Sequence, residues 1–383
     1  YGTIAALQGS PAIRPLTAAS RLRILVIRLD LLGDVVLSIP AIEALAAALP
    51  AARIDALALP YTAPILRRVS AVTTVHELDI HRYRRPRGWL KVGDLIRTIR
   101  RIRAEHYDLA IGLSGLMGGL FSALSGARWR VGYELETFRG CYNLPVRDRR
   151  YLRRQHEVEY CLDLVRSLGV HAEAGAIPRL GPSTGGSDQP SRTAPAHDLR
   201  LATPPYAVLV PGASNGAAKR WPPLNWARLG NRLAREAGLN LVIVGSASER
   251  ALAQGIVDQL TSPAVNLTGS TSIDELISLL TGAELVVAGD TGPLHVAAAV
   301  GTPVVGIYGP TDPMNSGPRG EHAAVVRLGL PCSPCYDLRS PADCKLPDRS
   351  AICMSQLSAE RVLEAIARVL RRDRDITNVF GSR

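Results

Sequence analysis

The fold is decided by the stretch Glu284-Leu-Val-Val-Ala-Gly-Asp-Thr-Gly-Pro-Leu-His-Val-Ala-Ala-Ala-Val-Gly-Thr-Pro-Val-Val-Gly-Ile-Tyr-Gly-Pro-Thr-Asp312. It predicts a buried strand over 285–288, a short apolar helix over 293–300 and a second buried strand over 304–308. Apolar strands joined by a helix are typical of a parallel sheet, whose ligands bind at the carboxyl ends of the strands. Free N–H groups at a helix start attract anions. Four residues are therefore expected to meet a phosphorylated ligand: Asp290, Thr291, Gly292 and His295.

The whole chain has 383 residues, which predicts two domains. Its content of 46% hydrophobic residues is sufficient for two cores. The net charge of +11 indicates acidic partners such as nucleotides, anionic glycolipids or a membrane surface. Nucleic acid is not expected, because only 5% of residues are aromatic and no nucleic-acid-binding motif is present. The first apolar segment carries Arg28, Asp30 and Asp34, unlike a secretion signal, so we expect a cytoplasmic protein that contacts the inner membrane surface.

Strands and helices are predicted to alternate along most of the chain, which indicates an α/β fold with doubly wound sheets. A flexible arm over 1–20 precedes a first domain over 21–180, and a Gly-, Pro- and Ser-rich linker over 181–205 follows it. The second domain covers 206–355 and contains a cysteine cluster at 332–353. A helix and tail over 356–383 end the chain.

The first domain opens with a predicted strand over 22–28, a turn, and a helix over 35–49. A dinucleotide fingerprint would need three glycines in this turn, and only Gly33 is present. The turn offers a carboxylate instead, Asp34, at the start of the helix.

Basic residues are concentrated in the first domain. Nine Arg or Lys residues and a single acid, Asp94, lie between Arg82 and Arg103. They form either a solvated helix face or a patch for an anionic acceptor or lipid headgroups. A second basic cluster consists of Arg147, Arg149, Arg150, Arg153 and Arg154.

Three segments together resemble the ADP-heptose:lipopolysaccharide heptosyltransferases of glycosyltransferase family 9. The first is Arg23-Ile-Leu-Val-Ile-Arg-Leu-Asp-Leu-Leu-Gly-Asp-Val-Val-Leu-Ser-Ile-Pro-Ala-Ile42. The second is Pro211-Gly-Ala with Lys219-Arg-Trp-Pro222 and Trp226. The third runs from Gly289 to Pro303 and continues through Gly309-Pro-Thr-Asp-Pro313. Their order and spacing match along residues 22 to 370.

The resemblance implies the glycosyltransferase-B fold, two Rossmann-like domains facing a cleft, with the acceptor in the first and the donor nucleotide in the second. It implies an inverting, metal-independent transfer of heptose from ADP-heptose to a lipopolysaccharide core or related glycan. Alternatives are a protein acceptor of the autotransporter type or another nucleotide sugar. An alternative of another class is a non-catalytic protein that binds nucleotide sugars or serves assembly.

By this resemblance Asp34 matches the catalytic base, because an inverting displacement needs a carboxylate to take the proton of the acceptor hydroxyl. A carboxylate at a helix start can also serve only as a cap. Lys219 matches the lysine directed at the donor phosphates, where a cation stabilises the leaving diphosphate. The four residues Asp290 to Gly292 and His295 match the donor-contacting motif, with packing as the alternative for His295. Ser214 and Asn215 are further expected diphosphate contacts.

Four of the six cysteines lie close together in the sequence: Cys332, Cys335, Cys344 and Cys353. A Cys-x-x-Cys pair with two further cysteines fits a tetrahedral thiolate site for structural zinc or iron. Two disulfides, which a reducing cytoplasm disfavours, and four unbound thiols are the alternatives. The resemblance adds that relatives which glycosylate autotransporter proteins carry a four-cysteine iron site.

Overall fold

The structure, a computed structural model, describes residues 21–80, 92–113, 117–134, 138–148, 155–181, 205–213, 216–336, 344–346 and 350–373. The expected arm over 1–20, all but the ends of the linker over 181–205, and the tail beyond residue 373 lie outside the described residues. The same holds for much of both basic clusters, since 81–91 and 149–154 are not described.

The first sheet has six strands in the order β3-β2-β1-β4-β5-β6. All pairs are parallel, and Ile24 in the central strand is in register with Ile54 on one side and Leu109 on the other. The strands are β1 (Arg23–Arg28), β2 (Arg53–Ala58), β3 (Thr74–Glu77), β4 (Leu109–Gly112), β5 (Trp129–Tyr133) and β6 (Leu144–Val146).

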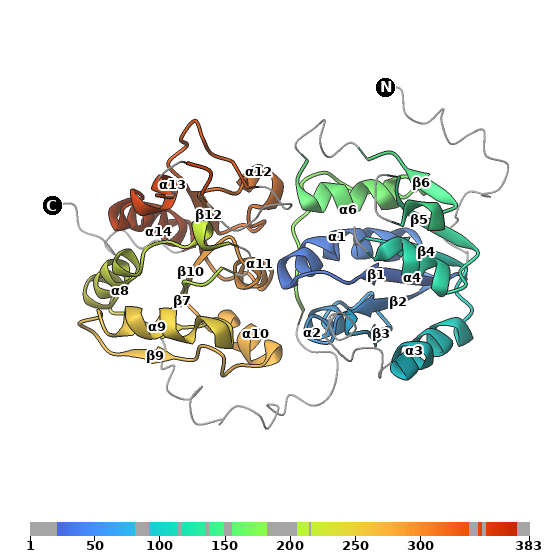
Figure 1. Ribbon diagram of the computed structural model, residues 1–383, viewed down its shortest axis with the longest axis horizontal. Coiled ribbons are helices and arrows are strands. Elements are labelled where there is room, and N and C mark those ends of the chain that lie inside the picture. Colours follow the sequence, from blue (N-terminus) through green and yellow to red (C-terminus); the bar gives the residue numbers. More distant parts are fainter. Residues whose placement is uncertain are drawn as a thin grey trace.

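The second sheet has the order β12-β11-β10-β7-β8-β9, again with every pair parallel. Numbered from its own first strand, this is the strand order of the first sheet, the 3-2-1-4-5-6 arrangement of dinucleotide-binding folds. The predicted α/β fold with two doubly wound sheets is thus confirmed (Figure 1). The strands are β7 (Tyr206–Val210), β8 (Asn240–Ile243), β9 (Ala264–Asn266), β10 (Leu285–Gly289), β11 (Val304–Ile307) and β12 (Ala323–Val326).

Each face of the first sheet has its own helical layer. Alternation along β1 sends Ile24 and Val26 into one apolar cluster and Leu25 and Ile27 into another, as expected for a strand buried on both faces. The cluster of Ile24 contains side chains of α1 (Leu32–Ala48), α2 (Ala63–Arg67) and α6 (Glu157–Arg166). The cluster of Leu25 contains side chains of α3 (Val92–Ala104) and α4 (Gly118–Leu124).

The second sheet is covered in the same way. One face packs on α8 (Pro223–Ala237), α9 (Arg250–Val257), α13 (Ile352–Ser355) and α14 (Ala359–Asp373). The other face packs on α10 (Ile273–Thr281) and α11 (Gly292–Ala299). A short helix, α12 (Pro313–Ser316), follows β11.

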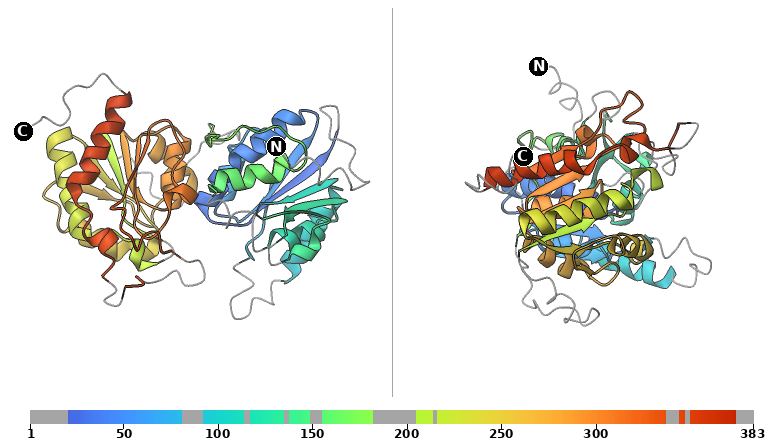
Figure 2. Two further views of the ribbon diagram at one scale, coloured as in Figure 1. Left: turned by 90° about the horizontal axis from the view of Figure 1, so that it is seen from above. Right: turned by 90° about the vertical axis from the view of Figure 1, so that its left-hand side faces the viewer.

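The two halves meet through the layers of α1 and α11. The apolar cluster that contains Ile24 continues without a break into the α10 and α11 face of the second sheet. The left view of Figure 2 shows the halves side by side, with α14, in red, on the side of the second half that faces away from the first. In the described parts of the chain, no helix is both long and apolar enough to cross a bilayer.

Three strands were not expected from the sequence, namely β5, β6 and β12. They lie toward the outer edges of their sheets, where residues are partly exposed and the apolar run is short. Pro145 in β6 is tolerated because an edge strand can lack an N–H donor on its open side.

Candidate active site

The candidate site lies where the starts of two helices meet. α1 follows β1 and α11 follows β10, and each of these strands borders the point at which the strand order of its sheet reverses. A Cβ added to Gly33 would come 2.8 Å from the His295 ring, and one added to Gly292 would come 2.7 Å from the Leu32 Cβ. The two glycines therefore let the helix starts touch, and Figure 1 shows α11 beside α1 at this junction.

Asp34 lies in the first turn of α1 but does not cap it. The N-cap position is Leu31, and no side chain caps the helix. The Asp34 side chain is 40% exposed, and its carboxylate lies 3.8 Å from a guanidinium nitrogen of Arg28. Burial raises the pKa of Asp34 to about 6 against the attraction of Arg28, and the charges of Glu157 and Asp30 add to the rise. A carboxylate with this proton affinity can act as a general base near neutral pH.

Tyr61 faces the same carboxylate from the turn after β2. Its hydroxyl lies 3.4 Å from the carbonyl oxygen of Asp30, and 40% of the residue is exposed. Burial, with the charges of Asp34 and Asp30, raises the pKa of Tyr61 to about 12, so the phenol stays protonated. Leu31, 43% exposed, adds an apolar surface at the α1 N-cap, next to the first turn that carries Asp34.

Asp290 is the centre of the second half of the site. Its carboxylate lies 3.1 Å from the Lys219 ammonium group, 3.2 Å from the Tyr308 hydroxyl and 3.9 Å from the His295 ring. Burial alone would raise the pKa of Asp290, but His295 and Lys219 outweigh it and hold the pKa below its usual value. Asp290 is thus a permanent anion that fixes the cation of Lys219.

Lys219 is presented by the short 3-10 helix η4 (Ala217–Lys219). The next residues anchor this helix, because Trp221 is 1% exposed and donates from its indole nitrogen to the Leu357 carbonyl at 2.8 Å. The Trp221 ring packs edge-on against Trp226 of α8, with 5.2 Å between centroids. From the other side, the Lys219 ammonium lies 5.2 Å from the ring centroid of Tyr336.

The remaining residues of the donor motif lie at the start of α11. Thr291 is the N-cap in extended conformation, and its hydroxyl lies 3.4 Å from the Gly289 carbonyl. His295 is 5% exposed, and its Nδ1 has no hydrogen-bond partner within the described residues. Its ring is packed against Gly33 of α1, so His295 joins the two halves of the site. Ser214 and Asn215, the two other expected contacts, lie outside the described residues.

Lys219 and His295 beside Asp290 were predicted from the sequence, but four further residues around the two carboxylates were not. Arg28 and Tyr308 are polar residues at the carboxyl ends of apolar runs. Because the carboxyl ends of parallel strands form the ligand-binding edge of a sheet, this position could have identified both residues from the sequence. Glu157 and Tyr336 gave no local signal, because only the tertiary fold brings them to the site.

The four cysteines that are clustered in the sequence, Cys332, Cys335, Cys344 and Cys353, do not form a metal site within the described residues. Burial raises the pKa of the Cys353 thiol to about 11, and the charges of Cys335, Cys344 and Cys332 add to this. The other three thiols are thus near enough to Cys353 for their charges to affect its pKa, yet within the described residues no three Cys, His, Asp or Glu side chains are placed to hold a metal ion. None of the six cysteines, all of which are described, forms a disulfide.

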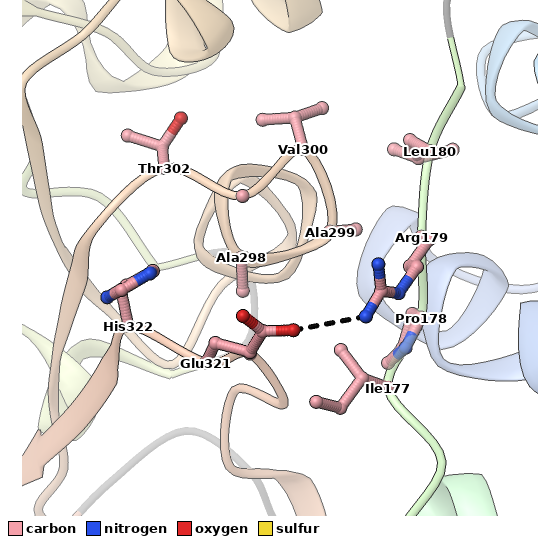
Figure 3. Close-up of a pocket in the computed structure, with 12 residues that line it drawn as sticks. Ile177, Pro178, Arg179, Leu180, Ala298, Ala299, Val300, Thr302, Glu321 and His322 are labelled. Atoms are coloured by element: carbon pink, nitrogen blue, oxygen red, sulfur yellow. Dashed lines mark hydrogen bonds and ion pairs between the residues drawn. The ribbon is translucent and has the colours of Figure 1, made fainter. Parts of the chain in front are cut away.

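A cavity of about 330 Å³ lies at the opposite edge of the second sheet (Figure 3). It is bounded by residues 177–180, the end of α11 and residues 320–322. Figure 3 shows Arg179 reaching across it to Glu321, at 3.1 Å. Because it adjoins the amino ends of β11 and β12, this cavity is separate from the site at Asp290.

The sequence and the fold of this chain match those of known proteins. The sequence model of "Glycosyltransferase family 9 (heptosyltransferase)" matches residues 95–346. Lipopolysaccharide heptosyltransferase 2 of Salmonella typhimurium is 30% identical over 318 residues, which cover 80% of this chain and 88% of that protein. The solved ADP-heptose lipopolysaccharide heptosyltransferase II of E. coli is 24% identical with a TM-score of 0.71, covering 92% of this chain and 99% of that one. It shows that the fold is glycosyltransferase-B.

The chain is also similar to the iron-containing dodecameric glycosyltransferase TibC of enterotoxigenic E. coli. The TM-score is 0.57 at 18% identity, covering 94% of this chain and 78% of that one. This likeness concerns the fold.

Proposed function

This chain belongs to glycosyltransferase family 9, and on that premise we propose that it transfers heptose from ADP-heptose to a lipopolysaccharide core or related glycan. The relatives named above are lipopolysaccharide heptosyltransferases, and one is named for ADP-heptose. We further propose that the acceptor binds to the first half, beside Asp34, and the donor to the second, beside Lys219.

The proposed reaction is a single inverting displacement. The oxygen of the acceptor hydroxyl attacks the anomeric carbon while the bond from that carbon to the diphosphate oxygen breaks. The electron pair of the broken bond leaves with ADP, and the proton of the hydroxyl passes to the Asp34 carboxylate. Lys219 and the N–H groups at the start of α11 meet the negative charge that develops on the diphosphate, so the proposal assigns no metal to this step.

The observation that carries the proposal is the contact between the two helix starts. Asp34 follows Gly33, which lies against His295, and His295 lies 3.9 Å from the Asp290 carboxylate that holds Lys219. A base with raised proton affinity and a cation for phosphate thus stand on either side of one short contact. That arrangement suits a transfer between two substrates held by separate sheets.

Calorimetric titration with ADP, UDP and GDP tests the donor half of the proposal. We expect ADP to bind most tightly and Lys219→Ala to weaken it by about tenfold, which is about 1.4 kcal/mol. Arg235→Ala, which removes an exposed cation at the far end of α8, is the control and should bind like the wild type. Preference for UDP or GDP would contradict ADP-heptose as donor, and unchanged ADP affinity in Lys219→Ala would remove that residue from the site.

We also propose a structural zinc or iron ion at Cys332, Cys335, Cys344 and Cys353. Burial and the charges of the other three cysteines raise the pKa of Cys353, and a cation bound to all four thiolates would offset the repulsion between these charges. The backbone N–H of Cys335 donates to the Pro310 carbonyl, and Tyr336 follows directly, so such an ion would stiffen the loop beside Lys219. Elemental analysis of protein purified without chelator should find about one equivalent of zinc or iron per chain. Less than a tenth of an equivalent of zinc plus iron would show that the thiols hold no metal and would contradict the proposed metal site.

Finally, we propose that the enzyme works in the cytoplasm at the inner membrane surface. The net charge of +11 supports attraction to anionic glycolipid. Within the described residues, α3 carries Arg97, Arg100, Arg101 and Arg103, which would add to such a surface. Sedimentation with vesicles of anionic lipid at low and high salt tests this, and binding that does not weaken with salt would contradict it.

A further inference from the structure

Arg28 is a buried cation that serves three carboxylates. It ends β1 and is only 2% exposed. One guanidinium nitrogen donates to the Leu113 carbonyl at the end of β4 and lies 3.5 Å from Asp30. The other donates to Glu157 at 2.8 Å and lies 3.8 Å from Asp34. A buried charge needs close partners, and Arg28 has its shortest carboxylate contact with Glu157 rather than Asp34.

Glu157 is held firmly in this position. It is the first residue of α6, where the helix dipole favours a carboxylate, and its side chain is 18% exposed. His156 caps the helix through Nδ1, while its Nε2 bonds the Gly317 carbonyl of the other half at 2.9 Å. Further along α6, Tyr160 stacks on Tyr133 with 3.9 Å between ring centroids.

We propose that Glu157 is a positioning residue for transfer: by taking the short hydrogen bond from Arg28, it keeps that cation from closing onto Asp34. The inference rests on the proposed role of Asp34 as the base. An aspartate in a tight bidentate pair with Arg28 would be a weak base, because the pair favours its ionised form. With Glu157 present, Arg28 still orients Asp34 from 3.8 Å but leaves its proton affinity high.

Within the described residues, four ionisable groups other than tyrosines face Asp34. Arg28 approaches from β1, Asp30 from the turn, Glu157 from α6 and His295 from α11. After burial and the opposing pull of Arg28, the Glu157 charge contributes most to raising the pKa of Asp34. Tyr61 and Tyr336, the other groups that sense the Asp34 charge, are neutral phenols near pH 7.

The direct test is an NMR titration of the Asp34 carboxyl in protein labelled with ¹³C at aspartate, with the signal assigned through Asp34→Asn. In Glu157→Gln the neutral amide oxygen accepts a weaker hydrogen bond from Arg28 than the carboxylate does, so the cation can close onto Asp34. We expect the Asp34 midpoint to fall by roughly one pH unit. The acid limb of the pH profile of kcat/KM should move with it, whereas ADP affinity should stay as in the wild type.

Glu159→Gln is the matched control. Glu159 lies on the same helix with 16% exposure, but its carboxylate faces Arg166, at 3.1 Å, and not Asp34. Its loss should leave the Asp34 midpoint where it is. Glu157→Asp, which restores the charge on a shorter side chain, should bring the midpoint back toward the wild-type value. A midpoint that is the same in Glu157→Gln as in the wild type overturns the inference.

The base role of Asp34 and the positioning role of Glu157 can be tested separately. If Asp34→Asn transfers heptose normally, the base assignment fails whatever Glu157 does to the titration. If Asp34→Asn is inactive and the Asp34 midpoint does not respond to Glu157→Gln, the enzyme assignment stands and the role of Glu157 is wrong.

Discussion

Asp34 and Asp290 both lie at a helix start, yet their neighbours move their proton affinities in opposite directions. Around Asp34, burial and nearby carboxylates outweigh a single arginine at 3.8 Å. Around Asp290, a lysine at 3.1 Å and a histidine outweigh burial. Two carboxylates with separated pKa values suit two roles, one exchanging a proton and one remaining an anion.

The pKa of Asp34 predicts how activity and stability depend on pH. Because the base must be ionised, kcat/KM should rise with pH through about 6 and level off above it. The folded chain binds this proton more tightly than an unfolded aspartate with its usual pKa of 3.8. The contribution of Asp34 to stability should therefore fall as pH rises between these two values.

Denaturant unfolding of the wild type and Asp34→Asn, measured at several pH values, checks the stability part. The free-energy difference between the two proteins should change between pH 4 and pH 6 and stay constant above. A difference that is constant throughout would mean that Asp34 titrates as it does in the unfolded chain.

The sequence could predict that Asp34 and Asp290 stand at helix starts, because each follows an apolar strand and a glycine accompanies it. It could not predict their electrostatic surroundings. Glu157 is separated from Arg28 by 129 positions, and the contact between them exists only because α6 packs against α1. Partners brought together by packing leave no spacing in the sequence.

At the scale of elements, strands and helices with strong apolar patterns were the predictable ones. The central strands β1, β7, β10 and β11 are fully or almost fully buried, which gives uninterrupted apolar runs. The edge strand β6 has no fully buried residue and contains a proline, so its pairing depends on the neighbouring strand rather than on its own composition.

The loop that presents Lys219 should depend on its tryptophan anchor. Trp221→Phe keeps an aromatic ring but removes the hydrogen bond to Leu357, which we expect to cost about 1 kcal/mol of unfolding free energy. The looser loop should also weaken ADP binding, because Lys219 loses its fixed position. Thermal unfolding and calorimetry measure the two effects. A less stable variant that binds ADP with unchanged affinity would show that the anchor serves the fold alone.

At the scale of the whole molecule, two sheets of identical strand order share one apolar cluster through α1 and α11. The sequence predicted two similar domains, but not that their contact runs through two glycines. From the sequence alone, a glycine that lets two helices come into contact looks the same as a glycine required by a turn, because the residue packed against it is unknown. Gly33 and Gly292 are such positions.

Gly292→Ala should therefore separate the two helix starts. Its new methyl group would lie 2.7 Å from Leu32 Cβ, so α1 and α11 must move apart, at a cost of about 1–3 kcal/mol, with a large loss of transfer. Gly255→Ala in α9 meets no atom within 4 Å and should instead stabilise the protein by about 0.5–1 kcal/mol, with full activity. Denaturant unfolding and a transfer assay compare the two. Equal activity in both variants would contradict the close contact.

The most direct measurement of the central claim is transfer from labelled ADP-heptose to a heptose-deficient lipopolysaccharide acceptor by the wild type and Asp34→Asn, with ADP binding measured on both. We expect a heptosylated product of inverted anomeric configuration from the wild type. In Asp34→Asn we expect unchanged ADP binding and a loss of transfer of at least about 100-fold. Transfer by Asp34→Asn at the wild-type rate, or a product that retains the donor configuration, would contradict this central claim.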